Sequence, residues 1–174
     1  MPYISVVTPC FNEEKSIREC YDTIKNIFVS MGDNYTYEHL FCDNDSSDKT
    51  FSILKEIAKT DKNIKLIRNS RNFGIFRNNY NGVLATSGDA VILLMPADLQ
   101  DPPELIPEFI KYWEEGYELV YGMRSRREMG IDNNMATRNR PMATPENMNN
   151  GTDAPVGDNL ARLSINDKDE GGFG

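Results

Sequence analysis

Residues that often mark catalytic or metal sites are scarce in this 174-residue chain. It has one histidine, His39, and three cysteines without a CxxC spacing. We therefore expect neither a zinc site nor a disulfide framework, and we expect a reduced cytoplasmic setting. His39 lies where a strand should begin, which favours a structural or surface role. Cys10 has no apparent histidine partner, so we interpret it as a packing residue rather than a nucleophile.

Charge and hydropathy exclude further classes. The net charge of -8 disfavours a nucleic-acid-binding surface, which needs a basic face. No apolar run approaches the ~18 residues of a transmembrane segment, and no basic-then-apolar leader is present. We accordingly predict a cytoplasmic chain with no transmembrane segment. The glycine-rich motifs GxGxxG and GxxxxGK[ST] are missing too, so neither a dinucleotide site nor a P-loop is indicated.

What the sequence does contain is an alternation of short apolar runs and amphipathic stretches. The length suggests one domain of ordinary size, and the alternation predicts an α/β sandwich with a mostly parallel sheet. The expected strands cover 3–8, 38–43, 64–68, 89–95 and 119–122, and the expected helices cover 16–29, 50–59, 76–86 and 102–115.

Two of these elements allow finer predictions. The run 89–95 is almost wholly apolar, as expected of a strand buried on both faces of a parallel sheet. Before the last helix, Asp101 is placed as the N-cap and Glu104 completes a capping box. Pro102 suits the first helical position, and Gly116 should end the helix.

The end of the chain has a different composition. Residues 129–174 contain only six residues of the types Leu, Ile, Val and Phe, against eight Asn, six Gly and three Pro. Such a segment buries too little apolar surface to offset chain entropy. We therefore predict a folded domain over 1–128 and a disordered or loosely attached tail over 129–174. Within the tail, 159–165 could form one helical turn or a strand.

Polar residues follow every expected strand, at the edge where open α/β sheets bind ligands. Carboxylates bind hydroxyls and hard cations, and arginines bind phosphates. Together they indicate a phosphorylated, polyhydroxylated ligand with a metal, such as a nucleotide diphosphate bridged by Mg²⁺ or Mn²⁺. The segments are PCFNEE (9–14), DNDSSD (43–48), SRNFG (70–74), PADLQD (96–101) and RSRR (124–127).

Five segments in register carry a resemblance: VVTPCFNEEKSI, CDNDSSDKT, RNSRNFG, ATSGDAVILL and ADLQDPPELI. Over roughly residues 3–128 the chain resembles family 2 glycosyltransferases, above all the polyprenyl-phosphate (dolichol- and undecaprenyl-phosphate) sugar transferases. The resemblance implies a GT-A fold, a Rossmann-like α/β/α sandwich. It also implies metal-assisted, inverting transfer of a sugar from a UDP- or GDP-linked donor to a polyprenyl phosphate or glycan. Such a role belongs to cell-envelope polysaccharide synthesis, in the cytoplasm or at the inner face of the membrane.

The resemblance also implies roles for single residues on the nucleoside side. Pro9, Phe11 and Glu13 would line the nucleoside pocket, with Glu13 accepting a hydrogen bond from a ribose hydroxyl. Asp43 would hydrogen-bond the base, with Asp45 close by.

On the diphosphate side, the resemblance makes Asp98 the metal ligand, flanked by Gln100 and Asp101. Arg124 or Arg126 would neutralise the departing diphosphate. The metal would act as a Lewis acid that stabilises the charge on the leaving oxygen without proton transfer.

Several of these residues have a structural alternative. Asn72 is a further candidate for binding the nucleotide sugar, but it could simply form a tight turn with Phe73 in the core. Asp101 could act as a helix cap, and Asp48 could cap the helix that starts after it. Arg126 could be solvated surface charge.

Two departures from the family pattern keep a second function open. Many relatives have Asp-Ala-Asp where this chain has Pro96-Ala97-Asp98, and residues 129–174 resemble no acceptor region. The alternative is a non-catalytic or truncated nucleotide-sugar-binding module. A nucleotidyltransferase is disfavoured because the loop after the first strand is not glycine-rich and basic. The sugar, the nucleotide, the acceptor and self-association into a homo-oligomer stay open.

Overall fold

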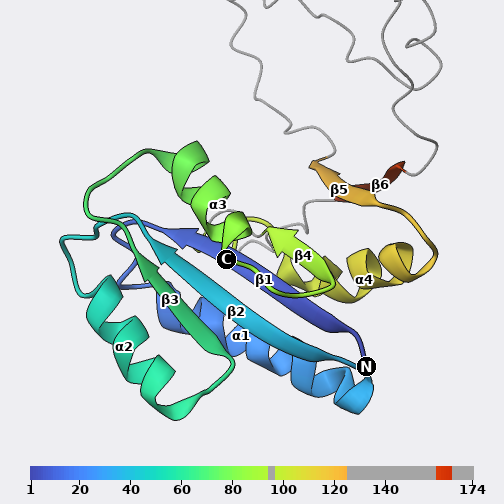
Figure 1. Ribbon diagram of the computed structural model, residues 1–174, viewed down its shortest axis with the longest axis horizontal. Coiled ribbons are helices and arrows are strands. Elements are labelled where there is room, and N and C mark those ends of the chain that lie inside the picture. Colours follow the sequence, from blue (N-terminus) through green and yellow to red (C-terminus); the bar gives the residue numbers. More distant parts are fainter. Residues whose placement is uncertain (94–96, 125–159, 166–174) are drawn as a thin grey trace, which may run out of the picture. The chain divides into compact units, whose positions relative to one another are not determined.

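The computed structural model describes residues 1–93, 97–124 and 160–165 (Figure 1). The chain divides into two compact units, Met1–Lys111 and Tyr112–Gly174, which we treat separately. In the described ranges, no helix has the length and apolar character needed to cross a membrane.

The first unit is built on a four-stranded sheet in the order β3-β2-β1-β4. All three neighbouring pairs of strands are parallel, which confirms the predicted α/β architecture. In the β1–β2 register Cys10 lies opposite Asp43, so both strands end at the same edge of the sheet. The strands are β1 (Tyr3–Cys10), β2 (Thr36–Asp43), β3 (Ile64–Arg68) and β4 (Ala90–Leu93).

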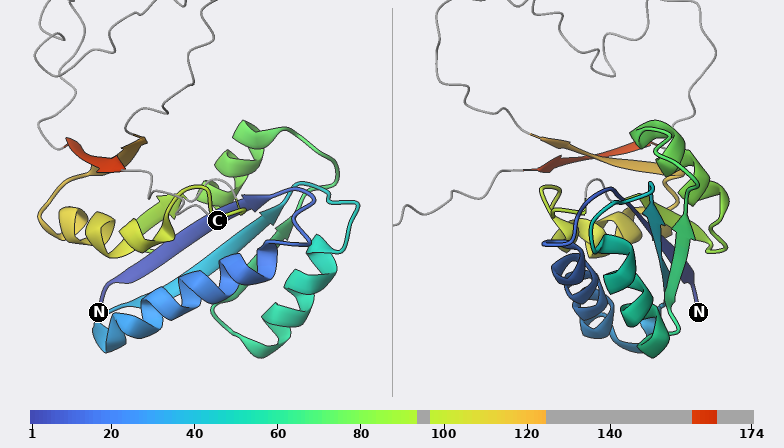
Figure 2. Two further views of the ribbon diagram at one scale, coloured as in Figure 1. Left: turned by 180° about the vertical axis from the view of Figure 1, so that it is seen from behind. Right: turned by 90° about the vertical axis from the view of Figure 1, so that its left-hand side faces the viewer.

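Helices cover both faces of this sheet. Figures 1 and 2 show α1 (Ile17–Ser30) and α2 (Thr50–Thr60) on one face and α3 (Ile75–Leu84) on the other. A short 3-10 helix, η1 (Gly32–Asn34), follows α1. Alternate residues of a strand point to the same face, and one core layer lies between the sheet and the buried side chains of α1 and α2. Its fully buried apolar side chains include Ile4, Val6, Ile17, Ile24, Phe41 and Leu54.

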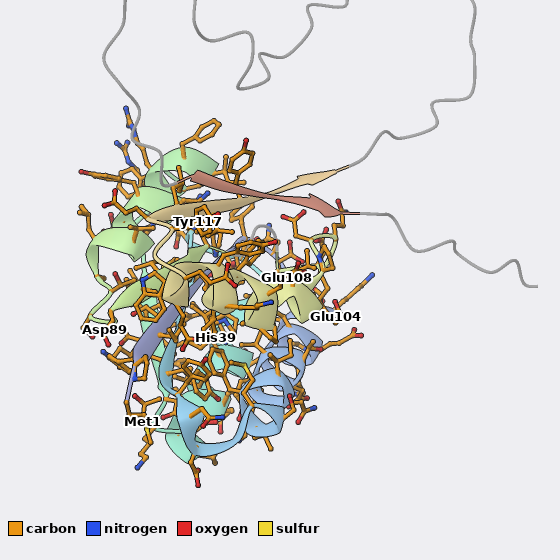
Figure 3. The ribbon with its side chains drawn as sticks, turned by 90° about the vertical axis from the view of Figure 1, so that its right-hand side faces the viewer. Met1, His39, Asp89, Glu104, Glu108 and Tyr117 are labelled. Carbon is orange, nitrogen blue, oxygen red and sulfur yellow. The ribbon has the colours of Figure 1, made fainter. Side chains whose placement is uncertain are left out.

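The single histidine belongs to this core. His39 lies within β2, is buried, and places its Nε2 2.9 Å from the Thr8 hydroxyl (Figure 3). Its ring packs on Phe41 with 3.9 Å between the ring centroids. Burial lowers the pKa of His39 to about 3, which keeps the imidazole neutral. The expected structural role is confirmed.

Strand β4 differs from its prediction. It is the edge strand of the first sheet, and Val91 and Leu93 are 41% and 43% exposed while Ile92 is buried. The expectation of burial on both faces is therefore wrong for these residues. An apolar run shows that a strand can be buried, but α3 packs mainly on β1 and β2 and covers β4 less, so Val91 and Leu93 stay exposed.

The start of the next helix also differs. The capping position belongs to Pro102 and carries no side-chain hydrogen bond, so the predicted Asp101–Glu104 capping box is wrong. Pro102 is extended (ψ 110°) because a residue that precedes a proline avoids the helical region. Glu104 lies on the surface (Figure 3). The chain forms a 3-10 turn first, η2 (Pro103–Leu105), and then α4 (Ile106–Glu114).

The second unit contains a small parallel sheet. After Gly116, whose φ of 98° ends the helix as predicted, β5 (Leu119–Arg124) pairs with β6 (Leu160–Ile165). The strand expected at 119–122 is thus confirmed, but its partner is β6 and not the first sheet. Of the two alternatives for 159–165, the strand is observed. The disorder predicted for the rest of the tail concerns 125–159 and 166–174, which lie outside the described residues, and the boundary after 128 stays a prediction.

Candidate functional site

The loops that follow β1 and β2 are bonded to each other. The Asn12 amide donates to the Ser46 hydroxyl at 2.9 Å, and the Ser47 amide donates to Asn12 Oδ1 at 2.9 Å. The Glu13 amide donates to Thr50 Oγ1 at 2.7 Å. Asn12 has a φ of 60°, a conformation that Asn tolerates better than most residues. These bonds fix the carboxylates of both loops at one edge of the sheet.

Asp48 joins the same two loops and also serves the helix that follows. Its Oδ1 accepts from the Thr50 amide at 2.9 Å, and its Oδ2 accepts from the Glu14 amide at 3.0 Å. Burial would raise the pKa of Asp48, but these hydrogen bonds bring it below its usual value. The expectation that Asp48 caps this helix is wrong in position, because the capping residue of α2 is Lys49; Asp48 lies one residue earlier and still accepts from the amide of Thr50, the first residue of α2.

Asp43 lies beneath this rim with a salt-bridge partner that the sequence analysis did not single out. Its side chain is 0% exposed, and its carboxylate accepts from the Ser46 amide at 3.2 Å. Arg68 Nε lies 3.5 Å from Asp43 Oδ2, and its Nη2 lies 3.3 Å from Asp45 Oδ1. The guanidinium also lies over the ring of Phe51, 4.8 Å from the centroid. Arg68 therefore covers Asp43 and bridges it to the half-buried Asp45.

Arg68 could have been found from the sequence. It is the last residue of β3, and the parallel register places it opposite Asp43. The sequence analysis considered polar residues after each strand, but Arg68 is the final residue within one.

Asparagines connect the β2 loop to α3. Asn44 Nδ2 donates to Asn72 Oδ1 at 2.8 Å, and the Gly74 amide donates to the same oxygen at 2.8 Å. The Phe73 amide donates to Asn44 Oδ1 at 3.0 Å. Asn72 thus forms the tight turn that was its structural alternative, but Phe73 is half-buried and does not belong to the core, so that part of the expectation is wrong. The turn fixes where α3 begins.

The segment after β4 presents the candidate metal ligand. Ala97 is buried, whereas Asp98 is exposed, with its Oδ1 accepting from the Gln100 amide at 3.2 Å. Gln100 is exposed and Asp101 is half-buried. Leu99 between them has a φ of 61°. The backbone therefore turns sharply and holds the Asp98 carboxylate outward.

Two buried thiols, Cys10 and Cys20, have pKa values that burial and the surrounding carboxylates raise. Burial, followed by the negative charge of Asp43, raises the pKa of Cys10 well above its usual range. Burial also raises the pKa of Cys20 to about 12, with smaller contributions from Glu13 and Asp98. Both thiols stay protonated at neutral pH, which supports packing over nucleophilic chemistry for Cys10. Glu13, after β1, and Asp98, after β4, thus both raise the pKa of Cys20. Asp43, at the end of β2, and Glu13 both raise the pKa of Cys10.

The remaining candidates occupy different settings. Pro9 is buried in β1 opposite Cys42, whereas Phe11 is exposed just beyond the strand. Arg124 is the last residue of β5, in the second unit. Arg126 lies outside the described residues.

A divalent cation fits this arrangement only together with a nucleotide. Among the described residues, no three side chains of the types His, Cys, Asp and Glu come together to hold a metal. Asp98 offers one exposed carboxylate. Mg²⁺ is commonly held by one or two carboxylates, with phosphate oxygens and water as the other ligands. The donor set therefore suits a cation that bridges a bound diphosphate.

Curated proteins similar to this chain carry glycosyltransferase names. The chain is 42% identical over 124 residues to the uncharacterized glycosyltransferase YkcC of Bacillus subtilis, covering 71% of this chain and 38% of YkcC. It is 39% identical over 124 residues to the bactoprenol glucosyl transferase of Shigella phage SfX, covering 71% of this chain and 40% of that protein. The chain thus spans about two fifths of the length of these relatives.

Solved structures agree on the fold. The mannosyltransferase PcManGT of Pyrobaculum calidifontis, in complex with GDP-Man and Mn²⁺, aligns with a TM-score of 0.58 and 20% identity, over 71% of this chain and 36% of that one. S. aureus TarS 1–349 aligns with a TM-score of 0.52 and 19% identity, over 75% of this chain and 38% of that one. Both likenesses support the expected GT-A fold.

The family match is broader than either alignment. Residues 5–166 match the family "Glycosyl transferase family 2", a span that includes both sheets except the first two residues of β1. By this match, which takes in most of the sequence, the chain belongs to glycosyl transferase family 2.

Proposed function

We propose that this chain is the donor-binding part of an inverting glycosyltransferase that transfers a sugar from a UDP- or GDP-linked donor to a polyprenyl phosphate. The observation that carries the proposal is the convergence of loops from β1, β2 and β4 at one sheet edge. Glu13, Asp45 and Asp98 bring carboxylates to that edge above the buried Asp43. The family match and the bactoprenol glucosyl transferases among the relatives support the reaction class and the acceptor.

The nucleoside would bind over the loops of β1 and β2. The exposed ring of Phe11 offers a surface for the base, and the half-buried Glu13 and Asp45 offer acceptors for base or ribose hydrogens. Asp43 would act from beneath, because Arg68 and the Ser46 amide occupy its carboxylate. A direct bond between Asp43 and the base would require Arg68 to move aside.

The diphosphate would lie toward the loop of β4, where Asp98 would hold Mg²⁺ or Mn²⁺. When bound, the cation would stabilise negative charge on the leaving diphosphate. Arg124 or Arg126 would supply further positive charge. Gln100 and Asp101 flank Asp98 in the sequence and would fix the orientation of the sugar or its phosphates.

Calorimetry with UDP and GDP tests the donor site. We expect Mn²⁺ to tighten binding of the matching nucleotide about tenfold or more over EDTA. Asp98→Asn should abolish that difference. Asp33→Asn is the matched control, because Asp33 is an exposed carboxylate in η1, before β2 and so at the opposite edge of the sheet. If the unaltered chain bound the nucleotide with equal affinity in Mn²⁺ and in EDTA, the assignment of Asp98 as a metal ligand would be wrong.

A transfer assay separates the enzyme from a binding module. UDP- and GDP-linked sugars would be incubated with Mn²⁺, with and without undecaprenyl phosphate, and the products separated by thin-layer chromatography. The proposal predicts a sugar-linked lipid from one donor. Nucleotide binding without transfer or donor hydrolysis would instead support the non-catalytic module.

A further inference from the structure

Helix α3 is amphipathic, but its large apolar side chains point away from the sheet and not toward it. Its buried residues are Asn78, Asn79 and Gly82. Phe76, Tyr80 and Leu84, spaced four residues apart, are 82%, 66% and 66% exposed. Residues four apart lie on one side of a helix. The large apolar side chains of α3 therefore form one outward stripe, while small or polar residues face the sheet.

The fold itself does not need that stripe, because α3 is attached by its inner face. Asn78 Nδ2 donates to the Cys42 carbonyl at 2.8 Å, and Asn69 Nδ2 donates to Asn78 Oδ1 at 2.8 Å. At Gly82 the helix backbone approaches β1 and β2 so closely that an added Cβ would lie 2.6 Å from Cys42 Sγ and from Val7 Cγ1. A contiguous exposed apolar stripe of this kind commonly marks a contact with another body.

The charge around α3 indicates the chemistry of the partner that would contact this stripe. Residues 62–88 contain five basic residues and no acidic residue, in a chain whose net charge is -8. Lys65 and Arg68 are paired with carboxylates of the sheet. Arg71 and Arg77 are exposed and form no ion pair with any carboxylate that the structure describes. Arg77 lies in α3 directly after Phe76, and Arg71 precedes the helix with its guanidinium 4.8 Å from the centroid of the Phe73 ring.

We propose that the outer face of α3, made by Phe76, Arg77, Tyr80 and Leu84 with Arg71 before it, docks onto an anionic lipid bilayer. A helix that carries apolar side chains beside basic ones lies in the interfacial plane, with its apolar side at the acyl boundary. The guanidinium groups then contact the lipid phosphates, and each adds to the attraction by an anionic leaflet.

Two other occupants fit this face less well. A second copy joined through a two-fold contact would bring the same patch of both chains together and oppose their exposed arginines. A nucleic acid needs a broad basic face, whereas in the part of the chain that the structure describes only Arg71 and Arg77 offer unpaired positive charge in or just before α3, and the chain is acidic overall. An anionic bilayer matches both the apolar stripe and its positive flank. The inference does not depend on sugar transfer, although a lipid-linked acceptor would lie in the same bilayer.

Vesicle co-sedimentation of the full chain tests the proposal. Binding to vesicles of phosphatidylcholine with phosphatidylglycerol should exceed binding to phosphatidylcholine alone, and it should fall with added salt. The variants are Phe76→Ser/Tyr80→Ser and Arg71→Gln/Arg77→Gln, each expected to weaken binding to the anionic vesicles roughly tenfold or more. All four side chains are exposed, so melting temperatures should stay close to that of the unaltered chain.

Matched controls lie on the opposite face of the sheet. Val29→Ser removes an exposed apolar residue from α1, and Lys55→Gln/Lys59→Gln removes two exposed charges from α2. Neither should change vesicle binding. Equal losses in the controls, or unchanged binding in the α3 variants, would overturn the proposal. So would a stable dimer in light scattering that the Phe76→Ser/Tyr80→Ser variant converts to monomer.

Discussion

Asp43 and Arg68 form the pair on which the candidate site rests. The carboxylate is fully buried, and its partners are one backbone amide and one guanidinium that is itself exposed. An unpaired buried charge is costly, so each member constrains the other. Arg68 also reaches the half-buried Asp45, and the pair therefore links the interior to the surface where a nucleoside would bind.

We predict that Asp43→Asn weakens binding of UDP or GDP by severalfold and lowers the free energy of unfolding by about 1–3 kcal/mol. Asparagine keeps the shape but removes the charge that holds Arg68. Calorimetry gives the first quantity and urea denaturation the second. Asp45→Asn serves as the comparison, because that side chain is half-buried and should affect stability less. Nucleotide affinity that Asp43→Asn leaves unchanged would show that the pair is structural only.

For single residues, the sequence predicted which residues matter better than it predicted how buried they are and which residues they contact. His39 and Cys10 were correctly judged structural, because a lone imidazole and a thiol without a basic partner offer little chemistry. Arg68 could have been found at the end of the predicted strand 64–68, but the complete burial of Asp43 depends on how the surrounding elements pack, which the sequence pattern does not encode. The Asp101 cap failed because the extended Pro102 moves the start of the helix forward.

Among the elements, α3 shows how backbone approach can replace apolar packing. Gly82 lies where a side chain would meet Cys42 and Val7 at 2.6 Å, shorter than any normal contact. The helix can come this close because its inner face carries small and polar groups. Its position in turn fixes the Asn72 turn at the edge of the site.

We predict that Gly82→Ala destabilises the protein by about 1–3 kcal/mol, as overpacked cores do. Helix propensity alone would favour alanine by about 1 kcal/mol, so the sign of the effect decides between the two causes. Urea denaturation measures it. Cys42→Ala in the same chain removes one of the two opposing atoms and should recover part of the loss. A more stable Gly82→Ala variant would mean that α3 is held less closely than described.

Most element boundaries followed from the sequence, with observed ends within two residues of the prediction where they are described; the exception is α4, which begins at Ile106 after a 3-10 turn and not at residue 102. Periodicity and β-branched runs determine local conformation, so this success was expected. Which strands pair with one another, and which faces they bury, was harder to predict. The exposure of β4 and the pairing of β5 with β6 depend on contacts between distant segments, which a pattern of apolar residues does not encode.

At the scale of the whole molecule, stability should decline in acid in two steps, because the buried His39 resists protonation first and the buried carboxylates of Glu38 and Asp61 resist it at lower pH. Burial lowers the His39 pKa from 6.5 to about 3. For Glu38, burial acts to raise the pKa, but the ion pair with Lys65 and the hydrogen bonds from Ser5 and Ser87 outweigh it and lower the pKa from 4.5 to about 2. Both contributions are complete above the pKa of the unfolded chain.

The sign follows from counting protons. Between pH 6.5 and 3 the unfolded chain binds a proton at His39 that the folded protein does not bind, so stability falls as pH is lowered. The slope for one such group approaches about 1.4 kcal/mol per pH unit. Glu38 adds a second contribution of the same sign between pH 4.5 and 2. Urea midpoints should therefore fall gently below pH 6.5 and more steeply below pH 4.5.

A variant and a spectroscopic measurement separate the two groups. His39→Gln should remove the slope between pH 6.5 and 4.5 but keep the steeper loss below it, since Glu38 still binds Lys65. Because the chain has one histidine, its imidazole gives a single NMR signal. That signal should stay that of neutral imidazole until the protein unfolds. A titration near pH 6.5 in the folded state would contradict the burial of His39, and with it the packing of the α1–α2 face that carries the loops of the site.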